Sequence, residues 1–292
     1  MTVVVALLVG AVTVLFLRIA GRSILAAPAL QRVNYRGRTL PTAGGILIVL
    51  AVLIIEAGRA VLGAIGVGDD PGLTLARSEV LFCVFGFAFL GLIDDLLGSG
   101  ADRGFRGHVR AVTEGRITTG FVKLLGGAGI AVLLVATPGF ATGRRLIVDA
   151  LLIALAANFG NLLDLAPGRT IKCAAVVYLP LAITVGVDPI GVAIAPVMGA
   201  AFALLPDDLG ERLMLGDTGA MVIGAVLGLG VVLGTSSGTR TVVLVALIAL
   251  NIAAEAVSFS RIIDRVGPLR AFDRWGQRPE RRRRRPGSGA AA

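Results

Sequence analysis

Charged side chains are scarce in this chain. Asp, Glu, Lys and Arg make up 16% of its 292 residues, whereas soluble domains carry about a quarter. Hydrophobic residues make up 55%, and the mean hydropathy is +0.86. The composition excludes an ordinary soluble domain and indicates an integral membrane protein. The strict alternation that marks an outer-membrane barrel is also missing, so we expect helical spans, whose backbone groups bond internally.

Cysteine and histidine are nearly absent as well. The two cysteines, Cys83 and Cys173, lie 90 positions apart in or beside apolar runs, which excludes a disulfide framework and a C-x-x-C metal site. The single histidine, His108, is interpreted as a surface loop residue. The first residues lack the basic start and cleavage site of a secretory signal peptide, so we interpret them as a retained span.

Apolar runs bounded by Gly, Pro and charged residues are long enough to cross a bilayer as helices. They predict nine spans, at residues 2–17, 43–65, 78–93, 120–138, 146–162, 172–187, 189–206, 218–234 and 240–258. Only GVDP separates the sixth from the seventh, so these two could also form one broken unit. The sequence thus predicts an all-α, polytopic membrane domain over residues 1–260, followed by a tail over residues 261–292.

Basic residues are distributed unevenly between alternate loops. If the N-terminus lies outside, the connections after the first, third, fifth and seventh spans are cytoplasmic, and so is the tail. These segments carry 23 of the 28 Lys and Arg residues. Because positive charge is retained on the cytoplasmic side of membrane proteins, we predict this orientation.

The tail combines apolar and basic residues at helical spacing. The apolar positions are Ile262, Ile263, Val266, Leu269, Phe272 and Trp275. Their alternation with arginines is typical of an amphipathic segment on an anionic membrane surface. The Arg281 to Arg285 run is interpreted as a solvated, lipid-attracted stretch, and we expect the end of the tail to be disordered.

Aspartates stand at several span ends on the predicted cytoplasmic side. Asp94 and Asp95 close the third span in GLIDDLLG, Asp164 closes the fifth, and Asp217 precedes the eighth. A single acid at a helix end is most simply the partner of a nearby arginine. Several acids on one side are different, because adjacent carboxylates repel and favour a bound cation. Carboxylate oxygens are the ligands that Mg²⁺ prefers.

Amide and basic side chains accompany these acids. Asn158 and Asn161 stand in the turns before Asp164, where their oxygens could complete a Mg²⁺ site. The basic residues on the same predicted face are Arg36, Arg38, Arg103, Arg106, Arg110, Arg116, Lys123, Arg169, Lys172 and Arg212. Phosphoryl transfer requires acidic side chains that bind Mg²⁺ and basic side chains that neutralise phosphate, since its catalysis is mostly positioning and charge stabilisation.

Four segments, in order, resemble the motifs of the polyprenyl-phosphate N-acetylhexosamine-1-phosphate transferases, which include the phospho-MurNAc-pentapeptide transferases. They are LPTAGG (40–45), GLIDDLLG (91–98), NFGNLLDL (158–165) and LGDTGAM (215–221). The resemblance runs over residues 34–275. It implies an enzyme that moves a phospho-N-acetylhexosamine from a UDP-sugar to a polyprenyl phosphate and releases UMP, which begins a lipid-linked cell-envelope glycan.

The resemblance also implies roles for individual residues. Asp217 would bind Mg²⁺, or Mn²⁺ in its place, with Asn161 as a second metal contact. Asp94 and Asp95 would activate or position the prenyl phosphate, and Asp164 would belong to the nucleotide and metal site. The remaining implied substrate-binding residues are Asn158, Lys123, Arg106, Arg169, Gly216 and Gly219. The two glycines would let the backbone approach the ligand closely.

Several positions depart from the family pattern. Pro167 stands where the family has a second acid, Gly98 stands where a lysine often follows the paired aspartates, and the tail has no histidine motif. These losses affect mainly groups that would read uridine and the sugar. A catalytically inactive member that binds prenyl phosphate or a partner enzyme is therefore an alternative. A cation-coupled transporter is a second one, although it would need acids at mid-span.

The expected partners follow from the resemblance. They are a polyprenyl phosphate, a UDP-N-acetylhexosamine and, at the tail, anionic membrane lipids, with no role for nucleic acid. The expected location is the bacterial inner membrane, with the active face towards the cytoplasm. The sugar, the prenyl length, the glycan pathway and the choice between monomer and homodimer are left open.

Overall fold

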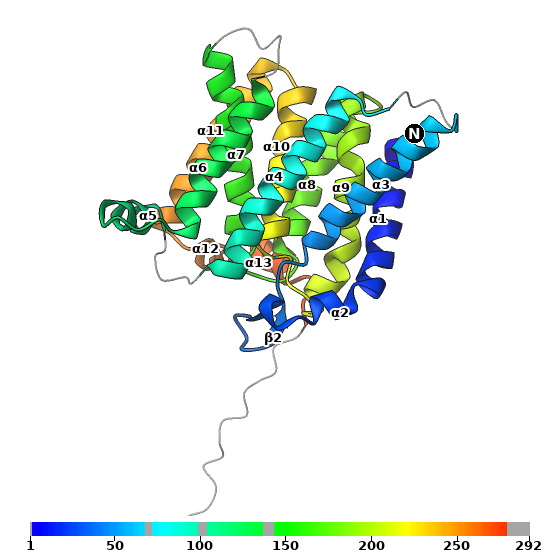
Figure 1. Cartoon of the computed structure of the whole chain (residues 1–292). Coiled ribbons are helices and arrows are strands. Elements are labelled where there is room, and N and C mark those ends of the chain that lie inside the picture. Colours follow the sequence, from blue (N-terminus) through cyan, green and yellow to red (C-terminus); the bar gives the residue numbers. More distant parts are fainter. Residues whose placement is uncertain (1, 68–71, 99–103, 137–142, 279–292) are drawn as a thin grey trace, which may run out of the picture.

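The computed structural model describes residues 2–67, 72–98, 104–136 and 143–278 as a bundle of long helices (Figure 1). Nine of them follow the nine predicted spans: α1 (Val3–Ala20), α3 (Ile46–Ala64), α4 (Leu75–Leu97), α6 (Thr119–Val135), α7 (Gly143–Leu163), α8 (Arg169–Val185), α9 (Pro189–Leu209), α10 (Gly216–Gly234) and α11 (Ser237–Ala256). In the described part of the chain, seven helices are long and apolar enough to cross a membrane. The other two, α6 and α8, have 17 residues each. The all-α, polytopic prediction is confirmed.

The sixth and seventh predicted spans are separate helices. α8 ends at Val185, and the residue after it, Gly186, has a φ of +48°, a conformation that glycine adopts without strain. α9 then begins at Pro189, and proline is favoured at the first position of a helix. The alternative of one broken unit is therefore wrong.

α10 occupies the centre of the bundle. In an apolar stretch of 18 residues within this helix, 89% of the residues are buried. The helix packs against α4, α7, α8 and α9. A Cβ added at Gly224 would lie 2.2 Å from the Ala156 carbonyl oxygen of α7, and one at Gly160 would lie 2.3 Å from the Ala220 carbonyl oxygen. Glycines thus let the two backbones meet. This contact holds the start of α10 beside the end of α7.

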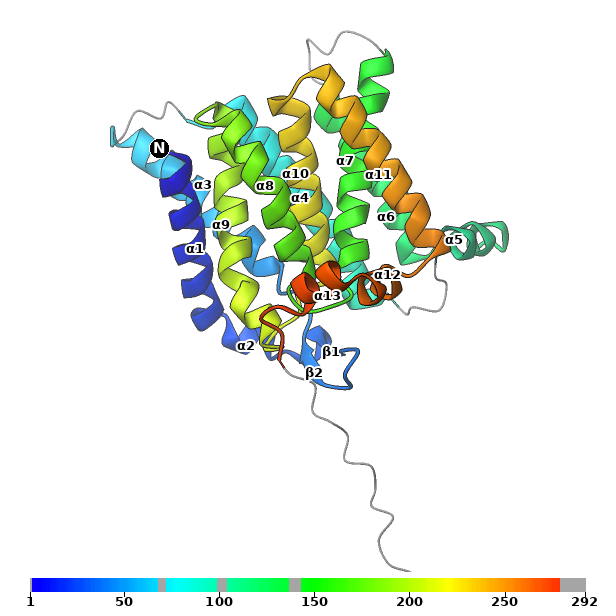
Figure 2. The same cartoon turned by 180° about the vertical axis from the view of Figure 1, so that it is seen from behind.

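Several short elements gather at one end of the bundle, which we call the loop end (Figure 2). It carries α2 (Arg22–Leu25), the 3-10 turn η1 (Pro28–Leu30), α12 (Phe259–Arg265) and α13 (Gly267–Arg274). The first turn of α1 lies at the opposite end, and α5 (Gly104–Thr113) projects from the side of the bundle. The acids at the ends of α4 and α7 and at the start of α10 therefore share one end. Which side of the membrane that end faces stays a prediction.

A short β-hairpin at the loop end was absent from the sequence prediction. β1 (Gln31–Val33) pairs in antiparallel fashion with β2 (Thr39–Pro41). In the turn, Asn34 Oδ1 accepts hydrogen bonds from the backbone N–H groups of Arg36 and Arg38, and Gly37 has a φ of +75°. Strands of three residues are too short for alternation to appear in the sequence.

The predicted tail is folded against the bundle as far as residue 278. Arg169 of α8 forms two hydrogen bonds with Asp273 of α13, at 2.7 and 3.0 Å. Lys172 Nζ donates to three backbone carbonyls at the end of α13. The segments on either side of the predicted boundary at residue 260 are thus in contact. The Arg281 to Arg285 run lies outside the described residues.

Candidate functional site

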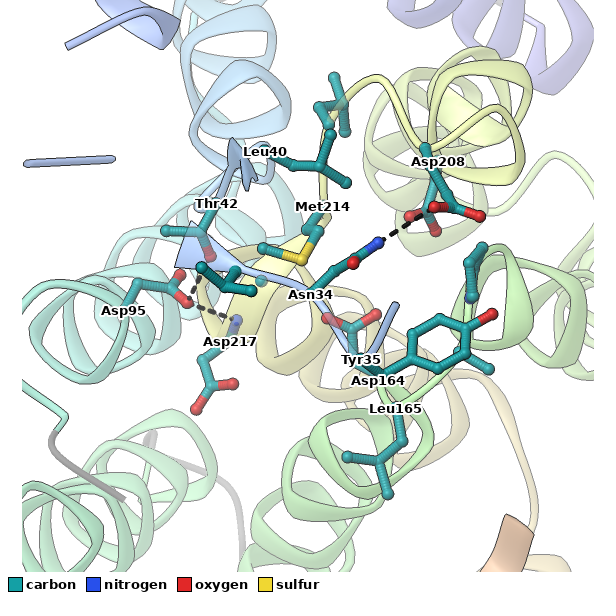
Figure 3. A pocket seen from close by; sticks show the side chains of 16 residues that line it. Asn34, Tyr35, Leu40, Thr42, Asp95, Asp164, Leu165, Asp208, Met214 and Asp217 are labelled. Carbon is teal, nitrogen blue, oxygen red and sulfur yellow. Dashed lines mark hydrogen bonds between the residues drawn. The ribbon is translucent and has the colours of Figure 1, made fainter. Parts of the chain in front are cut away.

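A cavity of about 420 Å³ opens among acids at the loop end (Figure 3). Asp95, Asp164, Asp208 and Asp217 line it, together with residues of the β-hairpin turn. Asp94 stands next to Asp95 at the end of α4. Acids at the ends of the third, fifth and eighth predicted spans therefore converge, as the predicted orientation requires.

Asp95 anchors the start of α10. Its Oδ1 accepts hydrogen bonds from the Asp217 N–H at 3.1 Å and from the Thr42 hydroxyl at 3.3 Å. Its Oδ2 accepts from the N–H of Thr218 at 2.9 Å and from its hydroxyl at 2.6 Å. The first N–H groups of a helix lack partners within the helix, and the helix dipole favours a carboxylate there. Both oxygens of Asp95 are therefore engaged in positioning Asp217.

Lys123 of α6 joins the other two acids. Its Nζ donates to Asp94 Oδ2 at 2.8 Å and also to Asp217 Oδ2. The side chains of Asp94 and Asp217 are 23% and 22% exposed. Two carboxylates around one ammonium leave a net negative charge. This group is thus a partly accessible cluster that can receive a further cation or, through Lys123, a phosphate.

Asp164 follows the last turn of α7 and faces the same cavity. It accepts a hydrogen bond from the Thr170 hydroxyl at 3.3 Å. Loss of hydration raises the pKa of Asp164 well above its usual value, and the negative charges of Asp208, Asp217 and Asp95 raise it further. The charged forms of these acids therefore repel one another.

The two glycines of the LGDTGAM segment have different surroundings. Gly216 lines the cavity with a φ of +71°, and a Cβ there would lie 2.7 Å from Asp95 Oδ2. Gly219 packs on Gly45, the residue that precedes α3, since its Cβ would lie 2.8 Å from Gly45 Cα. Gly216 therefore stands where a ligand would approach, whereas Gly219 serves a contact between helices.

Other predicted site residues lie away from the cavity wall. The Asn158 amide donates to Asn251 Oδ1 in α11 at 2.7 Å, and Asn161 is not among the described residues that line the cavity. Arg169 is held by Asp273. Arg106 belongs to α5, and its side chain lies outside the described part of the chain. The structure thus brings together the aspartates, Lys123 and Gly216 from the predicted set.

Two acids near the end of α9 complete the site and were not singled out from the sequence. Asp208 lines the cavity and accepts a hydrogen bond from the Gly168 N–H at 2.9 Å. Glu211 accepts from the side chains of Asn34 and Arg36 at 3.1 and 2.6 Å. The segment LPDDLGER carries the same signal as GLIDDLLG, namely paired aspartates at the end of an apolar run.

The donor atoms fit a hard divalent ion in chemical type, because Asp164 and Asp217 present carboxylate oxygens to one cavity. Among the described residues, no group of three or more His, Cys, Asp and Glu side chains is arranged around a common metal position. Lys123 now balances part of the charge on Asp217. A magnesium site at Asp217 stays a prediction.

No protein-family model matches the chain. The chain is similar to the phospho-N-acetylmuramoyl-pentapeptide-transferase of Deinococcus radiodurans, with 30% identity over 200 residues that cover 64% of this chain and 59% of that protein. It is also similar to the protein of the same name from Clostridioides difficile, with 25% identity over 243 residues that cover 79% of this chain and 70% of that protein. The match to the first relative thus spans less than two thirds of its length.

The fold and the cavity define a polytopic membrane protein with an acid-lined site at its helix ends. Both relatives are named as transferases of the family whose four motifs the sequence resembles. The chain is thus similar to proteins named phospho-N-acetylmuramoyl-pentapeptide-transferases, and its four motif segments resemble those of the polyprenyl-phosphate N-acetylhexosamine-1-phosphate transferase family.

Proposed function

We propose that this protein transfers a phospho-N-acetylhexosamine from a UDP-sugar to a polyprenyl phosphate, with release of UMP and with Mg²⁺ as cofactor. The observation that carries the proposal is the convergence of Asp94, Asp164 and Asp217 with Lys123 at the loop end. The named activity of the relatives supports the same reaction class. We further propose that the loop end faces the cytoplasm of a bacterial inner membrane, where UDP-sugars are made.

An apolar groove next to the acids supports a lipid acceptor. It has a volume of about 320 Å³ and lies among α7, α8, α10 and α11, with Phe159, Val177 and Leu247 in its wall. Thr170 lines this groove and donates its hydroxyl hydrogen to Asp164 of the acidic cavity. A prenyl chain in the groove would thus place its phosphate near the acids.

Each residue of the site would have a separate role in such a transfer. An oxygen of the prenyl phosphate attacks the phosphorus that bears the sugar. A new P–O bond forms, and the bond from this phosphorus to the oxygen shared with the uridylyl phosphate breaks, so UMP leaves with that oxygen. Asp94 orients the acceptor phosphate, and Lys123 offsets its negative charge. Mg²⁺ held at Asp217, with Asp164 facing the same cavity, would supply charge neutralisation for the diphosphate.

The test is release of UMP from a panel of UDP-N-acetylhexosamines by the purified full-length protein with undecaprenyl or decaprenyl phosphate. We expect Mg²⁺-dependent release with one or more donors and its loss in Asp217→Asn. Asp188→Asn is the matched control, because Asp188 is an exposed aspartate before α9 at the opposite end of the bundle. Activity that survives in Asp217→Asn would refute the assignment of the metal.

An inactive member that only binds prenyl phosphate is the second candidate. Two observations favour it: Lys123 already neutralises part of the charge of Asp94 and Asp217, and Pro167 lines the cavity where the family has an acid. Retained prenyl-phosphate binding without UMP release across the whole panel would establish it. A transporter is less well supported, because the convergent acids lie at helix ends rather than at mid-span.

A further inference from the structure

The tip of the β-hairpin presents an aromatic ring to the acidic cavity. Tyr35 lines the cavity and is 58% exposed. It is the single aromatic side chain among the described residues that line it. The guanidinium carbon of Arg36 lies 5.2 Å from the centroid of the Tyr35 ring, so a cation is stacked against it. An exposed aromatic ring beside an acidic cavity is a surface on which a planar group can stack.

The hairpin holds Tyr35 in a fixed position. The residues on either side of it, Asn34 and Arg36, both donate side-chain hydrogen bonds to Glu211, and Arg38 pairs with the same carboxylate at 3.3 Å. The Glu211 side chain is 2% exposed. Three hydrogen-bond donors on one buried carboxylate tie the turn to the end of α9, so little freedom is lost when a ligand contacts Tyr35.

The cavity lining combines acids with a short apolar wall. Asp95 and Asp217 lie on one side of the cavity, whereas Tyr35 lies near Leu165 and Asp164 on another (Figure 3). Leu165, Ala166 and Pro167 form the apolar wall, which follows directly on Asp164. A volume of about 420 Å³ is within the range of small-molecule sites. A ligand with a charged diphosphate at one end and a flat apolar face at the other matches this division.

The Asn34 side chain beside the ring is already engaged, whereas Arg36 Nε is buried without a hydrogen-bond partner. Asn34 uses its Nδ2 on Glu211 and its Oδ1 on backbone N–H groups. The apolar wall offers no side-chain donor or acceptor. A base at this position would therefore be held mainly by stacking, which is worth a considerable part of nucleotide affinity at aromatic platforms.

We infer that Tyr35, backed by Arg36, is the stacking platform for the nucleobase of the nucleotide-sugar donor. The inference rests on the proposed function, since it presumes a nucleotide donor, and it adds a specific substrate contact outside the four motif segments. Tyr35 binds the base and takes no part in bond making or breaking.

The experiment measures binding of UMP and of inorganic pyrophosphate, each with Mg²⁺, to the full-length protein in detergent. The variants are Tyr35→Ala and Tyr35→Phe, and Phe16→Ala is the matched control, because Phe16 is an exposed aromatic residue on α1 away from the cavity. We expect Tyr35→Ala to raise the Kd of UMP about tenfold or more. Tyr35→Phe and Phe16→Ala should bind UMP as the unmodified protein does. The Kd of pyrophosphate should be the same in every variant.

Two results would overturn the inference and separate it from the proposed function. If the unmodified protein binds UMP and Tyr35→Ala binds it equally well, the platform is wrong while the nucleotide donor stands. If Tyr35→Ala weakens UMP and pyrophosphate alike, Tyr35 only shapes the cavity. Failure of the unmodified protein to bind any nucleotide would refute the donor itself, and the platform with it. In active protein, Tyr35→Ala should raise the KM for the UDP-sugar with little change in kcat.

Discussion

Asp94 and Asp95 are sequence neighbours whose carboxylates have different partners. Asp95 accepts four hydrogen bonds from Thr42, Asp217 and Thr218, whereas Asp94 faces Lys123. In the reaction we propose, Asp95 is thus a positioning residue that acts through Asp217. Asp94 is the member of the pair with a carboxylate available to a ligand.

This difference gives a prediction for two conservative variants. Asp95→Asn puts an NH₂ group against N–H donors, so we expect a loss of about 1–3 kcal/mol in unfolding free energy and a lower melting temperature. Asp94→Asn removes a charge without removing a helix cap. We expect an unchanged melting temperature and a fall in UMP release of about 100-fold. Thermal unfolding in detergent and the UMP assay measure the two effects.

The prediction fails if the two variants lower the melting temperature equally, or if Asp94→Asn keeps full activity. Thr42→Val provides a graded control, since it removes one weak donor to Asp95 and should lower stability less than Asp95→Asn does. It leaves the Lys123 cluster intact.

The sequence predicted where the acids lie but not how they pair. Motifs and charge distribution were enough to place Asp94, Asp164 and Asp217 at one end. The hydrogen-bond partners of Asp95 lie 53, 122 and 123 positions away. Partnerships of this kind depend on tertiary packing, which no local spacing encodes. Arg169 is similar, because its partner Asp273 is 104 positions away.

At the scale of elements, the tail is held by one buried ion pair and a capped helix end. The side chains of Arg169 and Asp273 are 5% and 12% exposed. Gln277 Nε2 also donates to the Pro167 carbonyl oxygen at 3.0 Å, so the tail touches the segment that forms the apolar wall of the cavity. Docking of the tail should therefore influence the shape of the cavity.

We expect Asp273→Ala to undock α13, because removal of one partner leaves a buried guanidinium unpaired, which costs about 3–5 kcal/mol in a fixed structure. Release of the tail avoids that cost. Trp275 is the single tryptophan in the sequence, so intrinsic fluorescence reports on this element alone. We expect a changed emission and faster proteolysis after residue 258. The double variant Arg169→Asp with Asp273→Arg should restore both signals.

Asp264→Ala is the control for the tail experiment. Asp264 pairs with Arg274 at 3.0 Å, but both side chains are more than half exposed, and such surface pairs contribute little. If Asp264→Ala changes the Trp275 signal as much as Asp273→Ala does, the buried pair is not what holds the tail.

The helices were more predictable than the small elements. Each long apolar run carries many residues of signal, and hydrocarbon leaves the backbone no alternative to a helix. The hairpin of residues 31–41 depends on the Asn34 turn and on Glu211, which is distant in sequence. The amphipathic pattern of the tail was visible, but its docking onto α8 was not, because the sequence had suggested the membrane surface as its partner.

At the scale of the whole molecule, basic residues are concentrated at one end of the bundle. The segments predicted to be cytoplasmic carry 23 of 28 basic residues, and those within the described part lie at or near the loop end with the acidic cavity. A basic face attracts an anionic nucleotide, and the same charges resist transfer across the membrane. Orientation and the proposed function are thus linked, because a cavity that used a nucleotide sugar would have to face the compartment that holds it.

Single-cysteine labelling tests this link in a background with Cys83→Ala and Cys173→Ala. Ser237, at the start of α11, and Ser23, in α2, are exposed serines at opposite ends of the bundle. We expect a membrane-impermeant maleimide to label Ser237→Cys in intact cells and Ser23→Cys only after permeabilisation. The cysteine-free protein is the control for background labelling. The reverse pattern would turn the acidic cavity away from the cytoplasm, and a transferase that uses cytoplasmic UDP-sugars could not work in that orientation.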